Sequence, residues 1–132
     1  MIMGIGADIS SIMEFDDRFK DAASIFNKAH FTATELSYCA SQISGRPAQH
    51  LAARYSAKEA LIKALDQARG GKFSAIAPLL YTEIEVANDA EGRPFFALHG
   101  SLQKIAGQLG IENIHLSISH DNEYAIAFVI IE

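Results

Sequence analysis

The chain has 132 residues, of which 49% are hydrophobic and 20% charged, and its formal net charge is −5. This composition is typical of one ordered, soluble domain over residues 1–132, and the acidic balance argues against a general nucleic-acid binder, because phosphate neutralisation needs a basic surface. The single cysteine, Cys39, excludes an internal disulfide framework and favours the reducing cytoplasm. The chain opens with "MIMGIGADI", an apolar run that no basic segment precedes and that Asp8 interrupts, so we expect no signal peptide. It has no apolar stretch of about 18 residues, so we expect no membrane span.

The first residues predict a strand followed by a helix. Residues 1–9 form a β-rich run that ends at the acidic Asp8. Residues 14–28 have helical spacing, and their apolar side is formed by Phe15, Phe19, Ala22, Ala23 and Phe26.

The next two helices have recognisable beginnings. In "FTATELSYCAS", Thr32 or Thr34 is a candidate N-cap of a helix that contains Cys39. The segment 44–47, "SGRP", should interrupt the chain, and Pro47 suits the first turn of a long helix that follows.

The long helix, "LAARYSAKEALIKAL" at 51–65, has charges in unusual places. On a helical wheel Lys58 falls inside the apolar stripe and Glu59 at its edge, and the opposite side carries Ala53, Ala57, Ala60 and Ala64. We therefore expect the helix to pack on two faces, with charges that need a partner, a ligand or a metal. The simpler alternative is that Glu59 and Lys63 form a surface pair contributing roughly 0.2–0.5 kcal/mol.

The second half of the chain predicts strands. After a glycine-containing loop at 69–78, residues 81–89 and 95–100 should form a hairpin, and 101–110 a short helix that stops at Gly110. Residues 113–132 read as two strands joined at His120–Glu123. The predicted fold class is α+β, with a long central helix and an antiparallel sheet built from the N-terminal and C-terminal strands.

Ionisable residues stand at the ends of these elements, where sites are commonly built. Two carboxylates suit Mg²⁺, which fills its other positions with water and phosphate oxygens. Basic side chains that can bind phosphate are present at Arg54, Lys58, Lys63 and His120. A diphosphate substrate bridged by Mg²⁺ is the simplest ligand that uses both sets.

Five blocks are spread over residues 4–132: "GIGADISSI" from Gly4, "FTATELSYC" from Phe31, "LAARYSAKEALIKAL" from Leu51, "EIEVANDAEGRPFFALHG" from Glu83 and "SISHDNEYAIAFVIIE" from Ser117. In order and spacing they resemble the holo-acyl-carrier-protein synthase family of phosphopantetheinyl transferases, and the central helix is the most specific block. The resemblance implies a phosphopantetheinyl transferase-like fold. It also implies transfer of 4′-phosphopantetheine from coenzyme A to a serine of an apo acyl carrier protein or carrier domain, with adenosine 3′,5′-bisphosphate as the second product, in cytoplasmic fatty acid and lipid biosynthesis.

The resemblance also implies residue roles. Asp8 and Glu59 would bind Mg²⁺ and, with Lys63 near the phosphoryl group, form the catalytic set. Coenzyme A would be bound by Lys63 and by four residues around the nucleotide: Arg54, Gly92, Pro94 and His120. The family is a homotrimer with sites between subunits, so Arg54 and His120 would come from the neighbouring chain. The general base stays open among Glu59, Glu35 and a metal-bound water.

Three positions depart from the family pattern. Glu14 stands where an arginine usually helps to dock an acidic carrier protein, which suggests a non-standard carrier domain, unless Arg18, Lys20 or Lys28 takes that arginine's place. Glu91 replaces a common asparagine, and residues 66–78 replace a Gly-Thr-Gly loop, so we expect coenzyme A affinity to differ from that of the family. The alternatives to an active transferase are a coenzyme A-binding homologue without productive carrier docking and a purely structural trimer. We expect neither nucleic-acid nor membrane partners.

Overall fold

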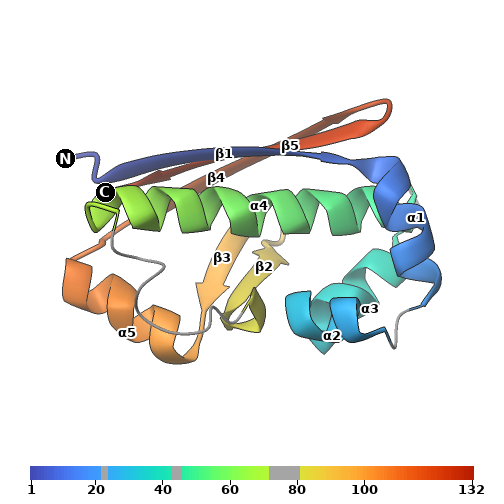
Figure 1. Cartoon of the computed structure of the whole chain (residues 1–132), viewed down its shortest axis with the longest axis horizontal. Helices are drawn as coiled ribbons and strands as arrows, with labels where there is room; N and C mark the ends of the chain where they lie inside the picture. Colours follow the sequence, from blue (N-terminus) through green and yellow to red (C-terminus); the bar gives the residue numbers. More distant parts are fainter. Residues whose placement is uncertain (22–23, 43–45, 72–80) are drawn as a thin grey trace.

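The computed structural model describes residues 1–21, 24–42, 46–71 and 81–132 (Figure 1). Within these residues no helix is both long and apolar enough to cross a membrane. The elements in chain order are β1 (Gly4–Ser11), α1 (Ile12–Lys20), α2 (Ile25–His30), α3 (Ala33–Ser41), α4 (Pro47–Ala68), the 3-10 helix η2 (Tyr81–Glu83), β2 (Ile84–Asn88), β3 (Pro94–Leu98), α5 (Gly100–Leu109), β4 (Ile114–Asp121) and β5 (Tyr124–Ile131).

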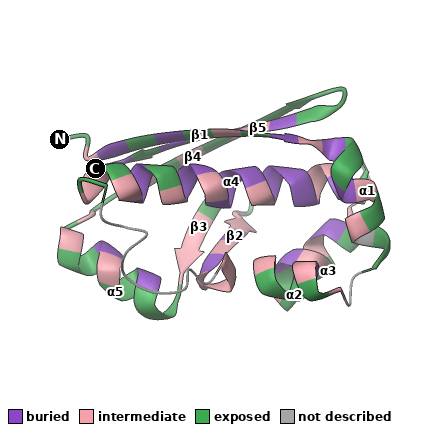
Figure 2. Ribbon diagram, viewed as in Figure 1, coloured by how far each residue is buried: buried purple, intermediate pink, exposed green. Residues whose placement is uncertain are grey.

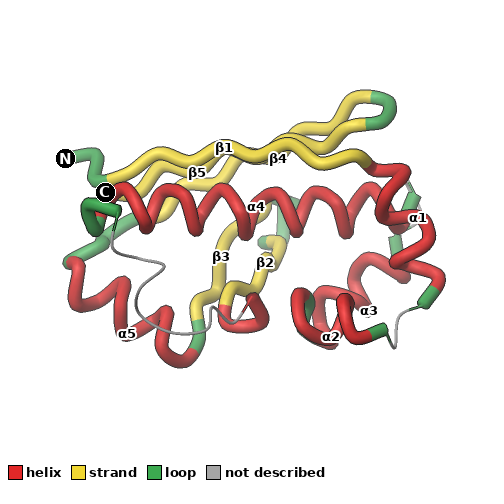
Figure 3. The backbone as a smooth tube through the Cα atoms, viewed as in Figure 1, coloured by secondary structure: helices red, strands yellow, loops and turns green. Residues whose placement is uncertain are grey.

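The long helix α4 lies between two layers (Figures 1 and 3). On one side is an antiparallel sheet in the order β1-β5-β4, as predicted from the N-terminal and C-terminal segments. On the other side are the separate β2-β3 hairpin and the shorter helices α2, α3 and α5. The predicted α+β class is confirmed by this arrangement. The two-faced packing of α4 is also confirmed, because Ala53, Ala57, Ala60 and Ala64 are all buried.

Strand β1 approaches α4 so closely that only glycine fits at two positions. A Cβ placed on Gly6 would lie 1.8 Å from the carbonyl oxygen of Ala60, and one on Gly4 would lie 2.1 Å from that of Ala64. Neither oxygen can move without disturbing the helix backbone. The close approach fixes Asp8 on β1 beside the charged residues of α4.

We expect Gly6→Ala to destabilise the protein by about 1–3 kcal/mol or more, since the added methyl group overlaps backbone rather than a flexible side chain. Gly107→Ala is the matched control: Gly107 lies within α5, a Cβ there meets nothing within 4 Å, and alanine favours a helix by roughly 0.5–1 kcal/mol. Urea denaturation would measure both variants, and equal stabilities would contradict the close-approach argument.

The prediction of one helix over 14–28 was wrong, because the structure has two, α1 and α2. The cause is the buried Asn27, whose Nδ2 donates hydrogen bonds of 2.6 and 2.9 Å to the carbonyl oxygens of Arg18 and Asp21 at the end of α1. Ala22, Ala23, residues 44–45 and most of the predicted loop, 72–78, lie outside the described residues, as does the Phe19 side chain.

Several helix and turn signals were correct. Thr32, rather than Thr34, caps α3 in a reciprocal capping box with Glu35, and Pro47 occupies the first turn of α4. Gly110 ends α5 in the left-handed conformation at φ 71°. The last turn is shorter than predicted, because β4 continues to Asp121 and Asn122 turns the chain at φ 51°.

Candidate functional site

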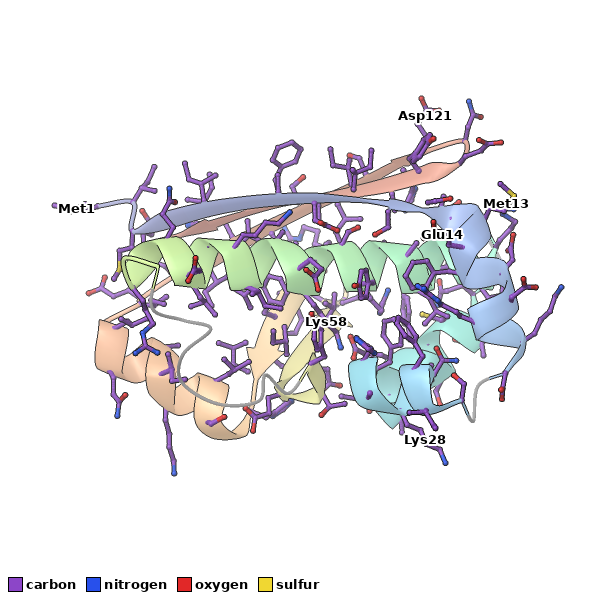
Figure 4. The ribbon with its side chains drawn as sticks, viewed as in Figure 1. Met1, Met13, Glu14, Lys28, Lys58 and Asp121 are labelled. Atoms are coloured by element: carbon purple, nitrogen blue, oxygen red, sulfur yellow. The ribbon has the colours of Figure 1, made fainter. Side chains whose placement is uncertain are left out.

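Lys58, labelled in Figure 4, is fully buried, and its contacts stabilise the fold. Its Nζ lies 2.6 Å from Oε1 of Glu35 and donates to the carbonyl oxygens of His30 and Tyr81, at 2.5 and 3.1 Å. Burial lowers the pKa of Lys58, and the Glu35 carboxylate opposes that shift. Lys58 was considered above as a side chain that can bind phosphate, but the structure shows it as the partner of a buried carboxylate.

Glu35 is equally inaccessible, with a side chain that is 0% exposed. Its Oε1 accepts hydrogen bonds from Lys58 and from the backbone N–H of Thr32, and its Oε2 accepts one from the backbone N–H of Val86 at 3.0 Å. A substrate hydroxyl cannot reach this carboxylate. Glu35 is therefore removed from the candidates for the general base.

Asp8 and Lys63 meet at the solvent-facing junction of β1 and α4. The Nζ of Lys63 lies 3.2 Å from Oδ1 of Asp8 and donates a 2.9 Å hydrogen bond to the carbonyl oxygen of Ala7. The Lys63 side chain is 54% exposed and that of Asp8 17%. Within the described residues Lys63 pairs with Asp8 and has no ion pair with Glu59, so the simple surface pair along α4 is not formed.

Glu59 is half-buried on the same side of α4, and the hydroxyl of Tyr81 donates a hydrogen bond to its Oε1. Burial, then the Glu59 carboxylate and then that of Asp8, raises the pKa of Tyr55. The same influences, led by burial, raise the pKa of Tyr81. Both carboxylates thus act on the same two hydroxyl groups, which places them in one electrostatic environment.

The donor set fits Mg²⁺. Among the described residues no cluster of three or more His, Cys, Asp or Glu side chains could hold a metal. Two carboxylates are nevertheless what a magnesium site typically takes from the protein when substrate phosphates and water complete the octahedron. Asp8, which pairs with Lys63, and Glu59, four residues before Lys63 on α4, would supply such a pair.

Arg54 lies in a pocket of about 380 Å³ between α4 and the β2-β3 hairpin. The pocket is lined by Thr34, Tyr38, Arg54, Val86, Ala87, Asn88, Asp89, Ala90 and Gly92. Arg54 is only 4% exposed; its Nη2 donates to Oδ1 of Asn88 at 2.8 Å, and its guanidinium lies 4.2 Å above the Tyr38 ring. The buried Nε has no hydrogen-bond partner among the described residues, which leaves one donor for a ligand. Pro94 follows this pocket as the first residue of β3.

His120 stands apart from that pocket, near the end of β4. Its Nδ1 lies 3.2 Å from Nε2 of Gln49, and its ring centre is 6.4 Å from that of His50. Burial and, second, His50 lower the pKa of His120. The structure therefore joins Asp8 and Lys63 near Glu59 and places Arg54 and Gly92 in one pocket. The His120 ring neighbours that of His50, which in turn neighbours Tyr38 of this pocket.

The surface of α1 carries Glu14, which is exposed at the beginning of the helix (Figure 4). Arg18, considered as a substitute docking residue, has its guanidinium 4.8 Å from the Phe15 ring centre and 4.1 Å from that of Phe26. Lys20 pairs with Asp17 at 3.7 Å, whereas Lys28 is exposed. Arg18 is thus engaged within the fold.

Sequence reasoning missed Tyr81, Tyr38 and Asn88. Tyr81 was read as the start of a strand, whereas it begins η2 and its hydroxyl contacts Glu59, 22 residues away. Tyr38 and Asn88 hold the Arg54 guanidinium from α3 and β2. No local pattern marks such contacts, because each joins elements distant in the sequence.

Comparisons with known proteins give a consistent family. The family model described as "4'-phosphopantetheinyl transferase superfamily" matches residues 4–129. A holo-[acyl-carrier-protein] synthase of Nocardia farcinica is 38% identical over 131 residues, which are 99% of this chain and 88% of the relative. The synthase of Geobacter sulfurreducens is 37% identical over 133 residues, 100% of this chain and 98% of the relative.

Solved structures of the same kind match the fold. The crystal structure of holo-[acyl-carrier-protein] synthase from Neisseria meningitidis has a TM-score of 0.79 at 30% identity, covering 100% of this chain and 99% of that one. A Chronobacterium ammoniagenes synthase in complex with coenzyme A has a TM-score of 0.79 at 33% identity, covering 97% and 95% of the two chains.

Proposed function

This chain belongs to the 4′-phosphopantetheinyl transferase superfamily, and we propose that it transfers 4′-phosphopantetheine from coenzyme A to a serine of an apo acyl carrier protein or carrier domain, with adenosine 3′,5′-bisphosphate as the second product. Full-length similarity to holo-[acyl-carrier-protein] synthases makes it an enzyme of that type. The observation that carries the proposal is the meeting of Asp8 and Lys63 beside Glu59. We place the activity in cytoplasmic fatty acid and lipid biosynthesis.

In this proposal Asp8 and Glu59 hold Mg²⁺, which would neutralise charge on the diphosphate of coenzyme A. Lys63, with its half-exposed ammonium group, orients a phosphoryl oxygen and stabilises negative charge during transfer. The serine proton needs an acceptor, and because Glu35 is buried, Glu59 and a metal-bound water remain as candidates.

The nucleotide of coenzyme A is assigned to the residues around the hairpin and the end of β4. The unpartnered Nε of Arg54 supports a phosphate contact, and Gly92, with φ 83°, lines the same pocket. We assign Pro94 to the nucleotide-facing turn and His120 to the 3′-phosphate.

We infer that the protein forms a homotrimer with sites between subunits. No described helix covers the outer face of the three-stranded sheet (Figure 2). On that face β1 and β5 carry exposed apolar side chains, whereas β4 carries His115, Ser117 and Ser119. Ile5 and Ile130 pair across β1 and β5, Ile9 and Phe128 flank them on the same face, and Ile9 and Phe128 are 61% and 51% exposed. Isolated soluble chains rarely leave such a continuous apolar face in water, which supports its burial against other copies.

The experiment that tests the function is intact-mass spectrometry of a panel of apo carrier proteins incubated with the enzyme, coenzyme A and Mg²⁺. A phosphopantetheine mass gain that is absent with Glu59→Ala supports the transferase and identifies the carrier. If no carrier gains mass while calorimetry detects coenzyme A binding, the protein is a coenzyme A-binding homologue. If coenzyme A does not bind either, a structural role in a larger assembly is favoured.

We expect Glu14→Arg to raise kcat/KM several-fold with an acidic carrier protein at low ionic strength. The exposed carboxylate repels an acidic partner, and salt screens this repulsion. Glu112→Arg, the same charge reversal on the far side of the chain after α5, should change nothing. If Glu14→Arg brings no gain, the proposal of a non-standard carrier loses its basis.

His120 should make coenzyme A binding pH-dependent. Its pKa is lowered by burial, so the imidazole is mainly neutral in the free protein at neutral pH, whereas a phosphate contact favours the charged form. Binding should therefore take up a proton at His120, and the affinity difference between wild type and His120→Gln should grow to about tenfold as the pH falls from about 8 to about 6. Calorimetry in buffers of different ionisation enthalpy measures the uptake, and an equal uptake in the variant would contradict the assignment.

A further inference from the structure

We propose that Tyr81 is a positioning residue for the Glu59 carboxylate, with Lys58 holding Tyr81 in place; this inference rests on the proposed magnesium site. Tyr81 begins η2, the short helix that leads into β2. Its hydroxyl donates to Oε1 of Glu59 on α4.

Two adjacent residues of α4 bind opposite ends of this tyrosine. Lys58 donates to the Tyr81 carbonyl oxygen at 3.1 Å, and Glu59 accepts from the hydroxyl. Between these two ends the ring is parallel to that of Tyr55, within 4° and at 6.3 Å, and is 4.5 Å from the His30 ring. Backbone, ring and hydroxyl of Tyr81 are thus all fixed.

This arrangement sets which oxygen of Glu59 is offered to a cation. The tyrosine hydroxyl donates to Oε1, and in this proposal Oε2 is the oxygen offered to Mg²⁺. Hydrogen bonds of this kind orient metal ligands, and their loss typically weakens metal binding by about 10–100-fold. The buried Lys58–Glu35 pair, through Tyr81, therefore acts on the geometry of the neighbouring residue Glu59 without contacting substrate.

The test is Mn²⁺ binding to the protein–coenzyme A complex, followed by electron paramagnetic resonance and corrected for the Mn²⁺ that coenzyme A binds alone. Tyr81→Phe removes one oxygen and keeps the ring contacts, so thermal unfolding should change little while Mn²⁺ binding weakens about tenfold. In turnover, the Mg²⁺ concentration for half-maximal rate should rise, and kcat at saturating Mg²⁺ should recover. Tyr124→Phe, at the exposed start of β5, is the matched control and should bind Mn²⁺ as wild type does.

A second readout is coenzyme A binding in the presence of a chelator. If Tyr81 acts through the metal ligand, the affinity for coenzyme A without metal should be the same in Tyr81→Phe and wild type. If Tyr81→Phe weakens this metal-free binding as much as it weakens Mn²⁺ binding, the role of Tyr81 is merely structural and the proposal is overturned. Unchanged Mn²⁺ affinity in Tyr81→Phe would overturn the role of Tyr81 alone. Absence of Mn²⁺ binding in the wild type would instead overturn the magnesium site on which the inference rests.

Discussion

Replacing Lys58 by methionine should lower the free energy of unfolding by about 3–5 kcal/mol, because it leaves the Glu35 carboxylate charged and buried without its partner. Both side chains are 0% exposed, so water cannot compensate. The carbonyl oxygens of His30 and Tyr81 would also lose their donor. Guanidinium denaturation, monitored by circular dichroism, measures this loss.

Lys63→Met provides the matched comparison, since it makes the same change on the same helix. Lys63 is half-exposed and its pair with Asp8 is screened by solvent, so the cost should be about 0–1 kcal/mol. Adding Glu35→Gln to Lys58→Met should recover part of the stability, because the buried charge is removed while one acceptor remains. If Lys58→Met costs no more than Lys63→Met, the buried pair does not have the structural role assigned to it.

The contrast between these lysines shows what local pattern can predict. The position of Lys58 within the apolar stripe of α4 indicated that it was buried, and the row of alanines indicated close packing on a second face. Both features follow from helical periodicity and were confirmed. The partner of Lys58, 23 residues earlier on α3, follows from tertiary packing and left no signal in the spacing.

The errors have the same origin. Apolar spacing continues from α1 into α2, yet the buried amide of Asn27 takes the carbonyl groups at the end of α1 and the chain turns there. For the site, the sequence placed Asp8 and Lys63 in one candidate set, and the structure joins them by an ion pair between β1 and α4. Tyr81 was missed because the contact between its hydroxyl and Glu59 joins residues that are 22 apart in the sequence and meet only in the folded chain.

Glu59→Gln should reduce kcat/KM for carrier modification by about 10²–10³-fold and raise the Mg²⁺ requirement. A bound metal contributes several kcal/mol to stabilising the transition state, and each 1.36 kcal/mol changes the rate about tenfold. Glutamine keeps the shape of the side chain and an oxygen for the Tyr81 hydroxyl, so the variant loses the charge offered to the metal and, with it, the capacity to accept the serine proton. Glu112→Gln, at an exposed position after α5, controls for a general effect of removing a carboxylate.

Steady-state rates of carrier modification, measured over a range of Mg²⁺ concentrations, test this prediction. Equal rates for Glu59→Gln and Glu112→Gln at limiting Mg²⁺ would leave Glu59 outside the reaction. The general base would then be a metal-bound water or a residue other than the two carboxylates considered.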